Sequence, residues 1–165
     1  MVLWYMEKGK IIYLEGVSRS GKTTLAKTLQ ARLNEPYFLL SGDMFWEIAP
    51  EKFRNNMDVI FPKIDAITPY TMKLFSDLGV DTIIDMVPVR GGFIKALYNC
   101  PVLYVKVSCS LEELRHREKN RSDRQIGLAE SQIETLFSND KYDIVVDTSI
   151  DTADECADKI IELLS

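Results

Sequence analysis

Apolar runs recur along the chain and alternate with segments of helical periodicity. Each run is nearly continuous in apolar, β-branched and aromatic residues, as expected of strands that are buried on both faces. The predicted strands cover residues 11–14, 37–40, 80–84, 102–107 and 144–146. Because strands and helices alternate over short connections, the pattern predicts an α/β fold in which helices cover both faces of a parallel sheet.

Two of the predicted helices show apolar stripes at the helical repeat. Leu25, Leu29 and Leu33 lie four residues apart, with Ala26 beside them, which predicts a helix over residues 22–33. A second stripe is expected to face the core and to end at Gly79, a residue suited to the position after a helix. The members of this second stripe are Ile67, Tyr70, Leu74, Phe75 and Leu78.

Two short motifs predict helix starts in the last third of the chain. Ser110 with Glu113, and Thr152 with Glu155, have the spacing of a capping box, in which each side chain accepts the other residue's backbone N–H. The helix after Thr152 is expected to bury its apolar residues, which are Cys156, Ala157, Ile160, Ile161 and Leu164.

Residues 49–69 form the least regular stretch, with Pro50, Pro62 and Pro69 and a polar cluster at residues 54–56. We interpret this stretch as a helical excursion over the sheet rather than as part of its frame. The whole chain of 165 residues is predicted to form one domain, residues 1–165, because this length suffices for one sizeable core.

Composition narrows the classes of function. The formal net charge of −5 argues against a general nucleic-acid binder, which is usually basic. No apolar stretch is long enough to span a membrane, and the charged first ten residues do not match a signal peptide, so we expect a cytoplasmic protein. Cys100, Cys109, Cys156 and the single His116 have no zinc-site spacing, which favours buried free thiols in a reducing compartment. The oligomeric state stays open.

Residues 16–23 match the phosphate-binding pattern GxxxxGK[ST], with a predicted strand before them and a helix after them. Two glycines permit a loop whose backbone N–H groups surround an anion, while Lys22 adds charge near the β- and γ-phosphates and Thr23 offers a hydroxyl to Mg²⁺. The alternative, a glycine-rich turn that matches by chance, is disfavoured by the strand–helix context. The expected nucleotide-binding residues are Gly16, Val17, Ser18, Arg19, Ser20, Gly21, Lys22, Thr23 and Thr24.

Two carboxylates follow predicted strands. Asp85 ends the apolar run 82–85, where a carboxylate can bind Mg²⁺ directly or through water, although many strands end in Asp. Asp43 follows the run 37–40, at the sheet edge where α/β proteins bind ligands, and can accept the proton of an attacking hydroxyl. Its alternative role is to cap a short helix over residues 44–48, and the residues alone leave both roles open.

A basic tract lies in this otherwise acidic chain. One interpretation is a solvated helix face on which Glu113 and Arg117 pair one turn apart. The other, which we favour, is an arginine lid over about residues 115–127 that closes on phosphates, because phosphoryl transfer needs cationic groups. His116 is expected to be a surface residue. The basic residues are Arg115, Arg117, Lys119, Arg121 and Arg124.

Five features in order resemble the chloramphenicol phosphotransferase-like group of P-loop kinases. They are residues 16–23, 37–43, 82–85 with 90–92, 117–132 and 142–149. The fourth is the most diagnostic, because it matches R-E-x-x-R-x-D-R-x-x-G-x-A-x-x-Q. The matching residues are Arg117, Glu118, Arg121, Asp123, Arg124, Gly127, Ala129 and Gln132.

This resemblance implies a three-layer αβα fold with a five-stranded parallel sheet, and transfer of the γ-phosphoryl of ATP to a hydroxyl of a small molecule. It implies ATP and Mg²⁺ as cofactors, Asp43 as the base, Lys22, Arg121 and Arg124 as catalytic cations, and Arg124 close to the nucleotide. Residues 147–149 would lie near the adenine, and an insertion of about residues 44–79 would shape the acceptor site.

The chain departs from the antibiotic-modifying enzyme at Arg19, a large cation where that enzyme has a small residue. It also differs at Phe137, where that enzyme has a histidine, and in the composition of the acceptor segment. The alternatives are a shikimate-, gluconate- or nucleotide-kinase-like enzyme, and a nucleotide-binding switch without catalysis.

Overall fold

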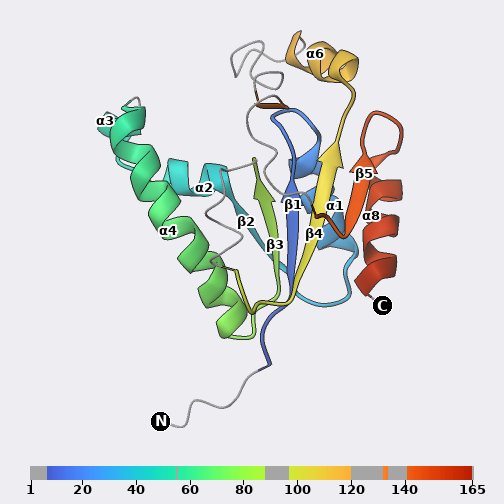
Figure 1. The fold of residues 1–165 in the computed structure, drawn as a ribbon, viewed down its shortest axis with the longest axis horizontal. Coiled ribbons are helices and arrows are strands. Elements are labelled where there is room, and N and C mark those ends of the chain that lie inside the picture. Colours follow the sequence, from blue (N-terminus) through green and yellow to red (C-terminus); the bar gives the residue numbers. More distant parts are fainter. Residues whose placement is uncertain (1–6, 55, 88–96, 120–131, 134–140, 165) are drawn as a thin grey trace.

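Five parallel strands form one sheet in the order β2-β3-β1-β4-β5 (Figure 1). The computed structural model describes residues 7–54, 56–87, 97–119, 132–133 and 141–164. The strands are β1 (Ile11–Glu15), β2 (Phe38–Ser41), β3 (Thr82–Met86), β4 (Val102–Ser108) and β5 (Ile144–Asp147). The predicted parallel sheet is confirmed, and its carboxyl ends all meet at one edge.

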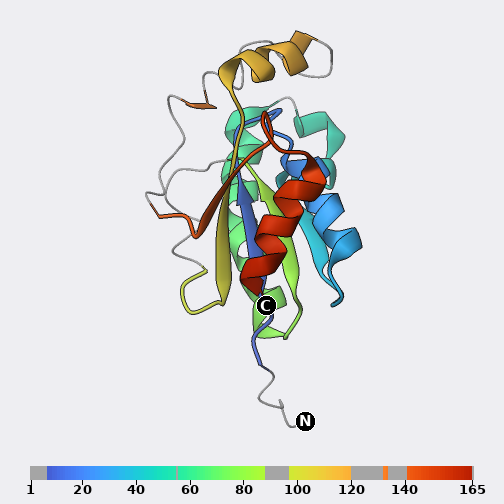
Figure 2. The ribbon, with the colours of Figure 1, turned by 90° about the vertical axis from the view of Figure 1, so that its right-hand side faces the viewer.

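Helices cover both faces of the sheet, as expected (Figures 1 and 2). Helices α1 (Lys22–Arg32) and α8 (Ala153–Ile161) lie together on one face, and α4 (Met57–Asp77) lies on the other. The shorter helices are α2 (Gly42–Glu47), α3 (Glu51–Arg54), α6 (Leu111–Lys119) and the 3₁₀ helix η1 (Glu162–Leu164).

Alternating side chains of β1 supply the two cores. Ile12 and Leu14 pack with Leu25 and Leu29 of α1 and with α8. Ile11 and Tyr13 pack with α4, because successive side chains of a strand point to opposite faces. Every residue of β1 and β3 is buried.

Burial of whole strands is confirmed for β1 and β3 but is wrong for the edges of the sheet. Phe38 of β2 is 54% exposed and Val145 of β5 is 57% exposed. The helices cover the middle of the sheet better than its sides, so an apolar run does not by itself distinguish a central strand from an edge strand.

The expected core stripe of α4 is also wrong. Ile67, Tyr70, Leu74 and Leu78 are each at least 45% exposed, and of the predicted set only Phe75 packs against the core. The face that meets the sheet instead carries Met72, fully buried, with the buried hydroxyl residues Thr68 and Ser76. These hydroxyls can be buried because Thr68 donates to the carbonyl of Ile64 and Ser76 to that of Gly9, each at 2.7 Å.

Most described residues of the stretch 49–69 are helical, as interpreted, because they belong to α3 and α4. Helix α4 runs through Pro62 and Pro69 without a break. It ends at Asp77, and Gly79 follows the C-cap Leu78 with a left-handed φ of 74°. The N–H of Val80 donates to the carbonyl of Phe75 at 2.9 Å. This closing hydrogen bond confirms the predicted helix stop.

The two predicted capping boxes differ in outcome. Thr152 and Glu155 form the complete reciprocal pair. At α6, the N–H of Glu113 donates to the Ser110 hydroxyl at 3.3 Å, but the Ser110 N–H donates to the hydroxyl of Ser149 at 3.2 Å. The carboxylate of Glu113 is thereby available to Arg117.

The three cysteines are free thiols, as expected, but only Cys156 is buried, while Cys100 and Cys109 are half-buried. Of the C-terminal apolar residues, Ile161 and Leu164 are likewise only partly buried. Among the described residues, no helix combines the length and apolar character needed to cross a bilayer.

The orientation of α4 can be tested by truncating one side chain on each face. We expect Met72→Ala to lower the free energy of unfolding by about 2–5 kcal/mol, because it leaves a cavity in the core. Leu74→Ala is the matched control and should change it by no more than about 0.5 kcal/mol, since Leu74 is 54% exposed. Urea unfolding of both variants measures the difference, and equal losses would contradict this orientation.

Candidate active site

The loop over residues 16–21 joins the buried end of β1 to the start of α1. A Cβ on Gly16 would lie 2.5 Å from the carbonyl oxygen of Val107, so this position requires glycine. Gly21 has a φ of 88° and stands as the N-cap of α1 without a side chain to cover the helix end. The loop therefore presents the backbone N–H groups of a helix N-terminus, the usual site for a phosphate.

Lys22 is drawn into this loop. It is only 6% exposed, and its Nζ donates to the carbonyl of Val17 at 2.8 Å. A buried ammonium beside a helix N-terminus is a strong site for the negative charge of phosphates. The role of Lys22 toward the phosphates stays a prediction.

Thr23 and Asp85 meet between the loop and β3. The Thr23 hydroxyl donates to the Asp85 carboxylate at 2.6 Å, and Asp85 is 8% exposed. Asp85 pairs in register with Leu14 of β1, which places its side chain on the sheet face that α1 covers. The two residues predicted as metal ligands are thus in direct contact.

Asp43 lies at the same edge of the sheet, in the first turn of α2. Its side chain is exposed. The alternative role as helix cap is wrong: the cap is Ser41, whose hydroxyl accepts the N–H of Met44 at 3.2 Å. Asp43 is therefore the second residue of the helix, where its negative charge interacts favourably with the helix N-terminus although its side chain is not the cap.

The described part of the basic tract, Arg115 to Lys119, belongs to α6. His116 is exposed, as expected. Arg117 pairs with Glu113 one helical turn away, with 2.8 Å between Nε and the carboxylate, so the predicted pair exists. Arg121, Arg124, Phe137 and residues 90–92 lie outside the described residues, as does most of the predicted lid.

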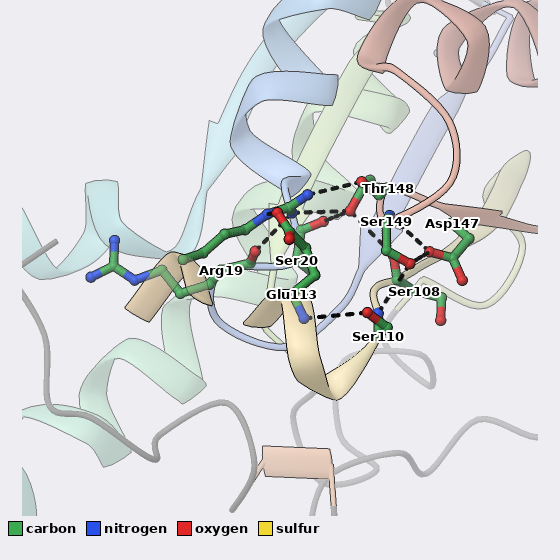
Figure 3. A network of polar contacts seen from close by, with 9 residues as sticks. Arg19, Ser20, Ser108, Ser110, Glu113, Asp147, Thr148 and Ser149 are labelled. Carbon is green, nitrogen blue, oxygen red and sulfur yellow. Dashed lines mark hydrogen bonds and ion pairs between the residues drawn. The ribbon is translucent and has the colours of Figure 1, made fainter. Parts of the chain in front are cut away.

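Arg117 also reaches the phosphate-binding loop, which the sequence did not indicate. Its guanidinium donates to the carbonyl of Arg19 at 3.2 Å and to the carbonyl of Thr148 at 2.8 Å. The Thr148 hydroxyl in turn donates to the carbonyl of Ser20 at 2.7 Å. Figure 3 shows this network around Thr148, with the side chain of Arg19 extending away from it.

Gln132 is a second contact to the loop, since its side-chain oxygen accepts the N–H of Ser18 at 2.6 Å. Gln132 is the last residue of the diagnostic pattern, and no role was predicted for it. Its contact ties the end of that pattern to the phosphate-binding loop.

Sequence reasoning missed a buried carboxylate beside the loop. Glu15, directly before Gly16, is 2% exposed and accepts a hydrogen bond from the Tyr142 hydroxyl. Lys106, its partner in register on β4, lies over the Tyr142 ring with 5.7 Å between Nζ and the ring centre. The signal that drew attention to Asp85, a carboxylate that ends an apolar strand, applies equally to Glu15.

Burial raises the pKa of Glu15 above its ordinary value of 4.5. The hydrogen bond from Tyr142 and the positive charges of Lys106 and Lys22 oppose this shift without cancelling it. The residue directly before the loop is therefore a carboxyl group whose ionised form is disfavoured by burial.

A family model described as chloramphenicol phosphotransferase-like protein matches residues 9–165 of this chain. The chain belongs to that family. An adenylyl-sulfate kinase from Clostridium kluyveri is 29% identical over 96% of this chain and 85% of its own length. A second adenylyl-sulfate kinase, from Clostridium acetobutylicum, is 28% identical over 96% and 84%.

Solved structures agree with the observed fold of this phosphotransferase-like chain. A sugar kinase from Janibacter has a TM-score of 0.74 at 22% identity, covering 94% of both chains. A shikimate kinase from Acinetobacter baumannii, solved with shikimate, has a TM-score of 0.67 at 20% identity, covering 96% of this chain and 94% of its own. With the family match, these findings identify an ATP-dependent small-molecule kinase of the P-loop kinase fold.

The buried carboxyl makes stability depend on pH. Because the folded state holds the Glu15 proton more tightly than the unfolded chain does, its contribution to stability falls as pH rises through the interval from 4.5 to its raised pKa. We expect Glu15→Gln to lack this fall. The difference in unfolding free energy, variant minus wild type, should therefore increase across the interval and stay constant at higher pH.

Urea unfolding at a series of pH values measures this difference. Glu162→Gln, at an exposed glutamate, is the control for removal of a surface carboxylate. A difference between Glu15→Gln and the wild type that does not change with pH would contradict the argument.

Proposed function

We propose that this kinase transfers the γ-phosphoryl of ATP to a hydroxyl group of a small molecule, with Mg²⁺ as cofactor. The observation that carries the proposal is the 2.6 Å contact between Thr23 and Asp85 beside the phosphate-binding loop. It joins a hydroxyl and a carboxylate at the place where a metal–nucleotide complex would bind. Asp43 stands at the same edge of the sheet, on the side of the acceptor insertion.

The phosphates of ATP would lie against the loop from Gly16 to Thr24, within reach of the Lys22 ammonium. Backbone N–H groups and one fixed cation need no rearrangement during the reaction, so they can stabilise charge that moves toward the leaving group. Arg121 and Arg124 would complete the neutralisation, as the resemblance implies.

The residues present fit Mg²⁺. Thr23 and Asp85 offer hard oxygen donors, which this ion prefers. Among the described residues no group of three or more His, Cys, Asp or Glu side chains converges, so the remaining ligands would be water and phosphate oxygens, as is usual for Mg²⁺. When bound, the ion supplies positive charge to the phosphates.

Asp43 would act as the general base. Its carboxylate would take the proton of the acceptor hydroxyl as the hydroxyl oxygen bonds to the γ-phosphorus. The bond from that phosphorus to the β–γ bridging oxygen breaks, and ADP leaves with the electron pair. Exposure of Asp43 keeps its carboxylate accessible to an acceptor from solution.

The acceptor is best sought among small alcohols. Two relatives are adenylyl-sulfate kinases, so adenylyl sulfate belongs in the first set, with shikimate, gluconate, nucleosides, nucleoside monophosphates and chloramphenicol. A reducing, cytoplasmic location is part of the proposal and agrees with the three free cysteines.

An acceptor panel tests the proposed function directly. We expect one compound to stimulate ADP release from ATP and Mg²⁺ and to raise the unfolding temperature further in the presence of ADP, because a ligand stabilises the state that binds it. Tight nucleotide binding with no transfer to any hydroxyl compound would instead favour a nucleotide-binding switch.

The role of Asp43 can be tested once an acceptor is known. We expect Asp43→Asn to lower kcat by about 10²–10⁴, because the general base is lost, while the affinity for ATP is unchanged. Glu47→Gln, one turn further along α2 and also exposed, is the matched control and should keep its activity. An unchanged kcat for Asp43→Asn would refute the assignment.

A further inference from the structure

Arg19 has a strained backbone within the phosphate-binding loop. Its φ of 65° is left-handed, a conformation that glycine adopts freely and that is sterically unfavourable for an arginine. Such strain persists only where surrounding contacts stabilise it. The loop therefore depends on groups outside itself for its shape.

Those contacts come from Arg117 of α6. Its Nη1 donates to the carbonyl of Arg19 at 3.2 Å and to the hydroxyl of Thr148 at 3.1 Å, and its Nη2 donates to the carbonyl of Thr148 at 2.8 Å. The remaining nitrogen, Nε, is occupied by Glu113. All three guanidinium nitrogens thus bind groups of the protein, and the planar geometry of the guanidinium fixes their relative positions.

Thr148 connects this guanidinium to the next residue of the loop. Its hydroxyl has one proton, which it donates to the carbonyl of Ser20 at 2.7 Å while it accepts the bond from Arg117. The backbone of Thr148 is itself anchored, since its N–H donates to the carbonyl of Ser108 at 3.0 Å. Two consecutive loop carbonyls, of Arg19 and Ser20, are therefore tied to the segment after β5 (Figure 3).

We propose that Arg117 and Thr148 are positioning residues that bind these two carbonyls and so keep the loop in the shape that receives the β-phosphate. A peptide unit carries its carbonyl and the following N–H on opposite sides, so binding the carbonyls of Arg19 and Ser20 directs the N–H groups of Ser20 and Gly21. The donors of Arg117 already have protein acceptors, so its guanidinium supports the loop.

The inference rests on the proposed binding of nucleotide phosphates by this loop. Its test compares Thr148→Val, which keeps the shape but loses the hydroxyl, with Thr148→Ser, which keeps the hydroxyl. Arg117→Gln removes the guanidinium, and Lys27→Gln removes an equal charge from an exposed position of α1 as a control. Dissociation constants for ADP with Mg²⁺ and for adenosine are measured by ligand-observed NMR.

We expect Thr148→Val to weaken ADP binding about tenfold and Arg117→Gln about tenfold to hundredfold, because Arg117 makes more of the lost hydrogen bonds than Thr148 does. Adenosine binding should stay within about twofold of the wild type, and Thr148→Ser and Lys27→Gln should bind ADP like the wild type. Hydrogen exchange of the amides of residues 17–23 should be faster in the two weakened variants without ligand, which reports the loop shape even if binding is lost.

Several results would overturn the inference. Equal losses of affinity for ADP and adenosine would place both residues beside the adenine. Equal losses of ADP affinity for Thr148→Val and Thr148→Ser would exclude a role of the hydroxyl. Unchanged hydrogen exchange of residues 17–23 would exclude a role in loop shape. Failure of the wild type to bind ADP would instead refute the proposed function. Thermal unfolding without ligand identifies a variant that does not fold. If the variants at one of the positions 117 and 148 do not fold, those at the other position test the inference.

Discussion

The parallel pairing of β1 with β3 on one side and β4 on the other is the constraint on which the site depends. Parallel strands end at the same edge, so the segments that follow the five strands converge there. The phosphate-binding loop follows β1, Asp43 follows β2, Asp85 lies near the end of β3, and Thr148 follows β5. Groups from distant parts of the chain meet without any long loop having to fold back.

The register of the sheet then divides these groups between its two faces. Asp85 lies beside Leu14 and so projects toward α1, where it meets Thr23. Glu15, the next residue of β1, projects to the opposite face beside Lys106. A shift of one residue in the pairing of β3 would move Asp85 away from Thr23, so the burial of β1 and β3 also protects the polar contacts at their ends.

The strands, helix α1 and the phosphate-binding loop were predictable because each depends on local patterns that few other structures satisfy. The inward face of α4 was not. Its exposed and buried stripes have the same helical spacing, and the buried one contains Thr68 and Ser76, whose hydroxyls are satisfied only by carbonyls that the fold supplies. Spacing cannot reveal such partners.

The same reasoning applies to the site. The contact of Arg117 with Glu113 was predictable from a separation of four residues, whereas its contact with Thr148 joins residues 31 apart. Glu15 was overlooked because its partner Tyr142 lies 127 residues away. Motifs identify residues that lie close together in the sequence. Partners that are distant in the sequence become visible only in the folded structure.

The bond between Ser20 and Thr148 spans 128 residues, from the first loop of the sheet to the last. A ribosome releases the glycine-rich loop early, but Thr148, which binds its Ser20 carbonyl, follows β5. Contacts of such long range form late in folding, when most of the chain is already in place. The loop therefore cannot gain this hydrogen bond before residue 148 has been synthesised.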